Sequence, residues 1–137
     1  MSSGRFLLGL LILILVAHYV GLVGNVYITY RWYDILMHIV GGAWVALLFF
    51  YLAGRFNLPL KNSFFWTLIA VLGFVALVGI LWEFYEYLTD VFILHKYGLG
   101  SAQSLWQAFD TLKDLFDDII GAIIASGAYF FLKKPSA

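Results

Sequence analysis

Four long apolar runs, separated by shorter polar stretches, dominate the pattern of the chain. They lie at about residues 6–23, 32–52, 64–88 and 112–132. A helix needs about 20 predominantly apolar residues to cross the hydrocarbon core of a bilayer, and each run is long enough to do so. The pattern therefore predicts an all-α integral membrane protein, built as a four-transmembrane-helix bundle and surrounded by membrane lipids.

The connections between the runs carry turn and helix-start signals. Pro59, flanked by Asn57 and Asn62, marks the second connection as a turn. In the longer third connection, Ser104 and Gln107 have the spacing of a capping box. We therefore expect an interfacial helix or loop before the last span, with a helix that starts near Ser104 and continues into the span.

Composition narrows the class further. The chain has 137 residues, of which 64% are hydrophobic, so residues 1–137 are predicted to form a single membrane domain. The absence of cysteine excludes disulfides, thiolate metal sites and cysteine nucleophiles. The charges form no basic face, so nucleic acid is excluded as a partner.

The basic residues near the span ends predict an orientation. With the N-terminus inside, the inner side holds Arg5, Arg55, Lys61, Lys133 and Lys134. The outer side holds Arg31, Lys96 and Lys113. Because basic residues concentrate on the cytoplasmic side, this bias predicts that the N- and C-termini are both cytoplasmic, in a bacterial inner membrane.

All the acidic residues lie in three short clusters. They are Asp34; Glu83, Glu86 and Asp90; and Asp110, Asp114, Asp117 and Asp118. Each cluster lies next to the same side of the membrane if the spans run alternately up and down. The three clusters are therefore predicted to meet at one end of the bundle, whichever way the protein is inserted.

Helical spacing predicts the depth and direction of these side chains. His38, Glu83 and Asp117 each lie about 8–9 Å below the end of their predicted span, at 1.5 Å per residue. Asp34 and His38 are four residues apart and so share a helix face. Because lipid solvates charge poorly, such faces should point into the bundle. Asp117 and Asp118 are about 100° apart, so one should face the site and the other a neighbouring helix, the long loop or another subunit.

The charge balance predicts a cation site. Buried carboxylates cannot all remain ionised without protons or a cation among them, and few basic groups lie near. Lys113 is offset from the acidic face and is expected to extend outward. Carboxylates together with an imidazole suit a divalent ion such as Mg, Mn, Zn or Fe. We expect metal binding by His38, Glu83 and Asp117. The candidate catalytic residues, as general base or as supports of the ligands, are Asp34, Glu86 and Asp114.

Three classes of function fit these features. The first is metal-assisted hydrolysis or transfer on a lipid-linked or envelope substrate. The second is a non-enzymatic structural or ligand-binding module, in which the carboxylates and His38 form a hydrogen-bonded polar core. The third is a proton or cation transporter, although the apolar inner halves of the spans argue against a continuous path. No HExxH motif, nucleophile motif or phosphate loop is present to name a reaction.

Small residues and His18 have simpler interpretations. Gly41, Gly42 and the stretch Gly121–Ala125 are expected to let helices approach closely. The small-residue face Gly121–Ala128 fits equally well as the seam of a homodimer. His18 has no acidic companion in its own span and is expected to serve packing or interhelical contact.

Three motifs in order resemble a known group of proteins. They are "DILMH" at 34–38, "WEFYE" at 82–86 and "DTLKDLFDDIIGA" at 110–122. The order is similar to that of the VanZ-like membrane proteins, and closer to that of the YjdF-like small bacterial inner-membrane proteins. VanZ-like sequences tend to have Gln where Glu86 stands, and Asn where Asp117 or Asp118 stands. The resemblance implies a bacterial inner membrane, and the VanZ-like family is linked to glycopeptide resistance.

Overall fold

The computed structural model describes residues 4–58, 63–93 and 105–132, which form helices and no strand. The helices are α1 (Gly4–Val23), α2 (Val26–Thr29), α3 (Arg31–Arg55), α4 (Phe64–Phe92) and α5 (Leu105–Leu132). All but the short α2 contain a stretch long and apolar enough to cross a membrane, so there are four candidate spans. The predicted four-helix membrane bundle is confirmed.

The helices extend beyond the apolar runs. α4 continues to Phe92, and α5 begins at Leu105, well before the apolar part of its span. The polar residues at these ends therefore continue the helical backbone instead of ending it. The expected helix start at Ser104 and the expected turn at Pro59 and Asn62 lie outside the described residues. Asn57, just before that turn, has a φ of 51°, in the left-handed region that asparagine tolerates.

A short helix that the apolar pattern did not predict joins the first two spans. α2 follows Asn25, whose φ of 53° turns the chain sharply after α1. The Thr29 hydroxyl donates a hydrogen bond of 3.0 Å to the Asn25 carbonyl, and Tyr30 returns the chain to an extended conformation before α3. This connection brings Tyr27 back towards α1 and α3.

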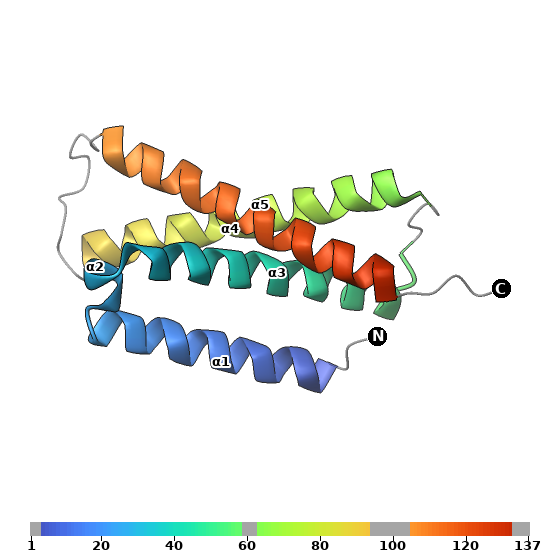
Figure 1. Cartoon of the computed structure of the whole chain (residues 1–137), viewed down its shortest axis with the longest axis horizontal. Helices are drawn as coiled ribbons and strands as arrows, with labels where there is room; N and C mark the ends of the chain where they lie inside the picture. Colours follow the sequence, from blue (N-terminus) through green and yellow to red (C-terminus); the bar gives the residue numbers. More distant parts are fainter. Residues whose placement is uncertain (1–3, 59–62, 94–104, 133–137) are drawn as a thin grey trace.

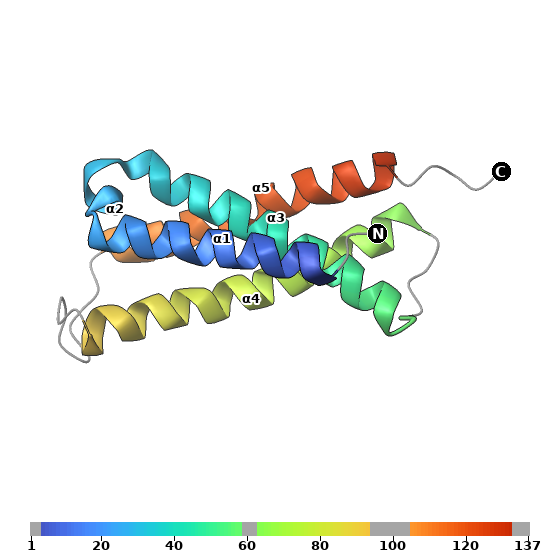
Figure 2. The ribbon, with the colours of Figure 1, turned by 90° about the horizontal axis from the view of Figure 1, so that it is seen from below.

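The spans have an up-and-down arrangement with α3 at the centre (Figure 1). The start of α3, the end of α4 and the start of α5 lie at one end of the bundle. α1 lies at the outer edge in Figure 1 and in front of α3 and α5 in Figure 2. It packs along α3, whereas the described residues show no close backbone approach between α1 and α4. The common end for the acidic segments agrees with the predicted connectivity.

Two glycines bring α3 and α5 into backbone contact. A Cβ atom on Gly42 would lie 2.1 Å from the Asp118 carbonyl oxygen, and one on Gly121 would lie 1.9 Å from the Ile39 carbonyl oxygen. Close approach through small residues is common between membrane helices, and these two glycines make it possible here. Gly41, by contrast, has open space where a Cβ would lie.

The small-residue face of α5 is divided between the interior and the surface of the bundle. Gly121, Ala122, Ala125 and Ser126 are buried within the chain, whereas Gly127 and Ala128 are exposed. Most of the face therefore serves packing inside the bundle. The homodimer seam along Gly121–Ala128 stays a prediction, and of the small residues in it only the exposed ones could contact a second chain.

The apolar core lies in the half of the bundle away from the acidic end. It includes Val45, Ala46, Phe49, Phe50, Val71 and Val75, together with Ala122 and Ala125. The rings of Phe50 and Tyr129 stack there with centroids 3.9 Å apart. Among the described residues, the buried polar side chains outside the acidic end are Thr67 and Ser126.

Candidate cation site

His38 forms the centre of the acidic end. It lies on the buried face of α3 and is only 5% exposed. Its Nδ1 atom is 3.4 Å from Asp118 Oδ1, and its Nε2 atom is 3.8 Å from Asp34 Oδ1 and 3.9 Å from Asp114 Oδ1. The imidazole therefore has a carboxylate at each nitrogen, contributed by α3 and α5.

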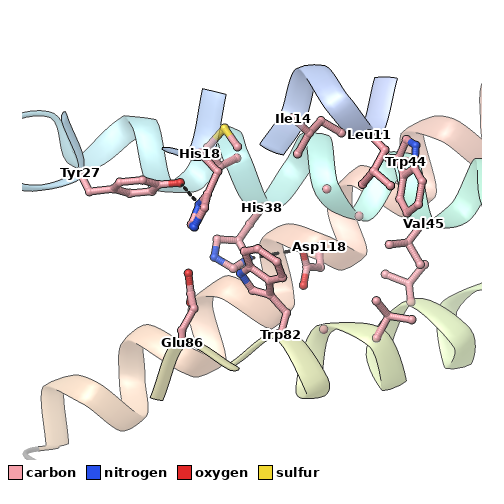
Figure 3. Close-up of a pocket in the computed structure, with 16 residues that line it drawn as sticks. Leu11, Ile14, His18, Tyr27, His38, Trp44, Val45, Trp82, Glu86 and Asp118 are labelled. Carbon is pink, nitrogen blue, oxygen red and sulfur yellow. Dashed lines mark hydrogen bonds and ion pairs between the residues drawn. The ribbon is translucent and has the colours of Figure 1, made fainter. Parts of the chain in front are cut away.

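The backbone contact of α3 and α5 sets the position of Asp118. Its carbonyl oxygen lies against Gly42, one helical turn after His38 in α3. Its carboxylate points at Gly79 of α4, where a Cβ atom would lie 2.7 Å from Asp118 Oδ2. The absence of side chains at Gly42 and Gly79 thus leaves the space in which the Asp118 carboxylate reaches His38 (Figure 3).

Lys113 turns into the cluster rather than outward. Its Nζ atom donates a hydrogen bond to Asp114, lies 3.1 Å from Asp34 Oδ2 and lies 3.6 Å from Asp117 Oδ2. The expectation that Lys113 extends outward is wrong. The reason is that three carboxylates attract one ammonium group, while a side-chain exposure of 28% leaves that group partly hydrated.

Two glutamates of α4 also lie close to His38. One ligand atom each from His38, Glu83 and Glu86 can be chosen so that all three lie within 4.8 Å of one another. The same holds for Asp34, His38 and Asp114, but there the Lys113 ammonium already bonds both carboxylates. Neither glutamate pairs with a lysine or arginine among the residues that the structure describes. Of the two groups, the glutamate group is therefore the one that no described lysine or arginine neutralises.

Two buried carboxylate oxygens have no hydrogen-bond partner among the described atoms. They are Glu83 Oε1 and Asp117 Oδ2. Glu83 is also hydrogen-bonded to the side chain of Thr111. An unsatisfied buried polar atom is costly, so such an atom indicates a ligand or water position.

Comparison of the sequence with known families gives a match. A family model described as "Predicted membrane protein (DUF2238)" matches residues 3–135. The chain belongs to this family. No curated protein and no solved structure matches it. The match to the DUF2238 family agrees with the membrane character that the motifs implied, and it supports neither the VanZ-like nor the YjdF-like name in particular.

In this DUF2238 protein, two of the three predicted metal ligands lie close together and the third lies apart from them. His38 and Glu83 lie together, but Asp117 belongs to neither group of potential ligands. Asp118 faces His38 instead, and Asp117 lies beside Lys113. The two aspartates are adjacent in sequence, and the contact at Gly42 and Gly121 fixes the rotation of α5 that decides between them.

The predicted catalytic carboxylates lie at two different positions around His38. Asp34 and Asp114 lie beside His38 and share Lys113. Glu86 lies with Glu83 and His38, where it is a potential ligand. Asp110 is exposed.

Sequence reasoning missed an aromatic group next to this site. His18 Nδ1 is 2.7 Å from the Tyr27 hydroxyl oxygen, and the His18 ring lies edge-on to Trp82 with centroids 5.2 Å apart. Burial, with a smaller contribution from Glu86, raises the pKa of Tyr27, so its hydroxyl stays protonated and can donate to His18. No sequence signal predicts this group because Tyr27 lies in a connection and His18 has no acidic neighbour along the chain.

Proposed function

We propose that the acidic end binds one divalent cation through His38, Glu83 and Glu86. The observation that carries this proposal is the distribution of charge around a histidine that is 5% exposed. Lys113 neutralises Asp34 and Asp114, whereas Glu83 and Glu86 pair with no lysine or arginine among the described residues. The unpaired Glu83 Oε1 atom offers a ligand at that position.

Asp118 supports His38 as a ligand in this proposal. A metal-binding histidine usually donates its other ring N–H to a carboxylate, which fixes the tautomer and the direction of the ring. Asp118 Oδ1 lies 3.4 Å from Nδ1, so the cation would bind at Nε2, the nitrogen that also lies near Asp34 and Asp114. Imidazole and carboxylate ligands fit Mg, Mn, Zn or Fe(II): zinc and iron suit the imidazole, and magnesium and manganese suit the carboxylates.

The chemistry we propose is metal-assisted hydrolysis or group transfer on a lipid-linked or envelope substrate. A bound divalent ion would polarise a phosphoryl or carbonyl oxygen and lower the pKa of a bound water. Asp34 and Asp114 lie beside His38 and outside the proposed ligand set, so they are the candidates for the general base. We place the site on the extracytoplasmic side, with both termini cytoplasmic, on the basis of the lysine and arginine bias alone.

Two other functions remain as alternatives. In the first, the cluster is a structural polar core, and the bonds from Lys113 to Asp34 and Asp114 favour that function. In the second, the protein transports protons or cations. The core beyond the cluster is apolar, with Thr67 and Ser126 as its buried polar side chains in the described part of the chain, which argues against transport.

A manganese titration distinguishes cation binding from a structural core. Purified protein in detergent micelles should bind one Mn²⁺ per chain, detected by electron paramagnetic resonance. Glu86→Gln should weaken binding by at least about 100-fold, because loss of a ligand costs no less than loss of a supporting residue. Asp110→Asn, which removes an exposed acid at the same end, should leave the affinity unchanged.

The contrary result is equally clear. If the wild type binds none of Mg²⁺, Mn²⁺, Zn²⁺ and Fe²⁺, the cluster is not a cation site. Equal affinities for Glu86→Gln and the wild type would remove Glu86 from the ligand set. Asp118→Asn should lower the Mn²⁺ affinity by about 10- to 100-fold if Asp118 orients His38.

A further inference from the structure

A cavity of about 280 Å³ lies between α1, α3 and α4, next to the proposed cation site (Figure 3). Leu11 and Ile14 of α1 line one wall, and Val75 and Val78 of α4 line the other. Gly41 of α3 lies between the two walls. We call this space the α1–α4 cavity. It exists because α1 packs on α3 without approaching α4 closely.

The way α1 is held shows that the cavity is part of the fold. Trp44 Nε1 donates a hydrogen bond of 2.9 Å to the Leu7 carbonyl oxygen, and the Tyr33 hydroxyl donates one of 2.7 Å to the Ala17 carbonyl oxygen. Leu11 and Ile14 lie between these two attachment points along α1. The helix is thus fixed to α3 on both sides of the cavity, at a separation from α4 that leaves the space open.

The size and the apolar lining of the cavity favour a hydrocarbon chain as its ligand. Protein interiors seldom leave voids larger than a water molecule, and an apolar cavity of about 150 Å³ already binds benzene. The α1–α4 cavity is larger, and its walls lie in the membrane-spanning segments. Leu13 of α1 and Leu77 of α4 are exposed on the adjoining helix surfaces, where lipid chains surround the protein. A lipid chain is therefore the nearest available occupant.

The polar groups of the cavity lie together at one end. His38, Glu86 and Asp118 line this end, as do His18 and Tyr27. Figure 3 shows Tyr27, His18, His38 and Glu86 on the left, Leu11, Trp44 and Val45 on the right, and Asp118 between the two sets. One apolar compartment with one polar end matches an amphiphile that inserts a single chain and holds its head at the proposed cation site.

We propose that the α1–α4 cavity binds one hydrocarbon chain of a lipid phosphate, with the phosphate head at His38 and Glu86. The carboxylates of Glu86 and Asp118 lie at that end, so an anionic head requires a divalent ion between them and it, as Mg²⁺ is commonly held by carboxylates and substrate phosphates together. The position of the head therefore rests on the proposed function, whereas the position of the chain rests on the cavity alone. The substrate class of the site is then a long-chain phosphate ester.

The test uses a long-chain alkyl phosphate that carries a photoreactive diazirine on its chain. Crosslinking to full-length protein in detergent, with Mn²⁺ present, should label peptides that contain Leu11, Ile14 or Val78. Gly41→Leu should reduce labelling at least about tenfold, because its side chain occupies the volume of several methylenes. Gly73→Leu is the matched control, since Gly73 also has open space around a Cβ but does not line the cavity.

A second pair of variants guards against a folding defect in α3. Ile14→Trp fills the cavity from α1, whereas Leu13→Trp adds the same ring to a residue that is 64% exposed. Only Ile14→Trp should reduce labelling. Equal labelling in Ile14→Trp and Leu13→Trp, or in Gly41→Leu and Gly73→Leu, overturns the placement of the chain.

The two proposals fail in different ways. Gly41→Leu should keep the Mn²⁺ affinity of the wild type while it loses the lipid, because Gly41 supplies no ligand. If lipid labelling is unchanged by removal of the cation with EDTA, or if an alkyl ammonium probe labels as well as the phosphate, the phosphate head is overturned. If the wild type binds no Mn²⁺ but the probe still labels the cavity residues specifically, the cation site is overturned and the position of the hydrocarbon chain is not.

Discussion

Replacing Gly121 with alanine is expected to destabilise the bundle by about 3 kcal/mol or more, at the upper end of the cost of overpacking. The added methyl group would lie 1.9 Å from the Ile39 carbonyl oxygen and 2.8 Å from the Ala43 nitrogen. Both neighbours are backbone atoms of α3, so no side-chain rotation can relieve the clash. The helices must separate, and thermal unfolding in detergent micelles should show a markedly lower midpoint.

Gly127→Ala is the matched control for this substitution. Gly127 lies on the same helix, and a Cβ there meets nothing within 4 Å. The control should unfold at the wild-type temperature or slightly above it, because alanine favours the helix over glycine. Similar unfolding temperatures for Gly121→Ala and Gly127→Ala would contradict the close approach of α3 and α5.

The same substitution should also disturb the proposed cation site. Asp118 lies one helical turn before Gly121, and its contact with His38 depends on how closely the two helices approach. Any Gly121→Ala protein that remains folded should therefore bind Mn²⁺ more weakly than the Gly127→Ala control. Unchanged affinity would mean that Asp118 does not orient His38.

Replacing Lys113 with methionine is the second substitution with a large expected effect. It removes the ammonium group from Asp34, Asp114 and Asp117. Removing one partner of a fully buried ion pair costs about 3–5 kcal/mol, and we expect about 2 kcal/mol here because Lys113 is partly exposed. Thermal unfolding in detergent at constant pH measures the loss.

Two further variants identify the cause of that loss. Lys113→Arg keeps the positive charge and should lose less stability than Lys113→Met. Adding Asp114→Asn to Lys113→Met should recover part of the stability, since it removes one of the carboxylates left unpaired. A Lys113→Met protein as stable as the wild type would instead mean that the lysine extends to the membrane surface.

The Lys113→Met variant also tests whether Lys113 keeps a cation away from Asp34 and Asp114. With the ammonium gone, Asp34, His38 and Asp114 form a second group that can hold a divalent ion. Mg²⁺ should then raise the unfolding temperature of the variant more than that of the wild type, because a ligand that binds only the folded state stabilises it. This difference follows from the charge distribution and does not require the protein to be an enzyme.

The sequence by itself determined the membrane fold and the end of the bundle where the acidic residues meet. Apolar runs near 20 residues long require four spans, and alternation of the spans brings Asp34, Glu83 and Asp114 to one side. Helical spacing places Asp34 and His38 on one face, and the cost of charge in lipid turns that face inward. These conclusions depend only on length, period and hydrophobicity, which are properties of the chain.

Only the tertiary structure decided which of the polar groups meet. Asp118 rather than Asp117 faces His38 because backbone contact at Gly42 and Gly121 sets the rotation of α5, and spacing within one helix carries no information about that rotation. Lys113 turns inward because three carboxylates converge on it from two helices.

The α1–α4 cavity likewise depends on which pairs of helices touch. The apolar residues of α1 look alike in sequence, and no periodicity distinguishes those that face lipid from those that line a cavity. The attachment of α1 to α3 through Trp44 and Tyr33 makes that distinction. Contacts between segments far apart in the chain thus decided which residues surround His38 and how large the space beside it is, because a local pattern cannot specify a distance between helices.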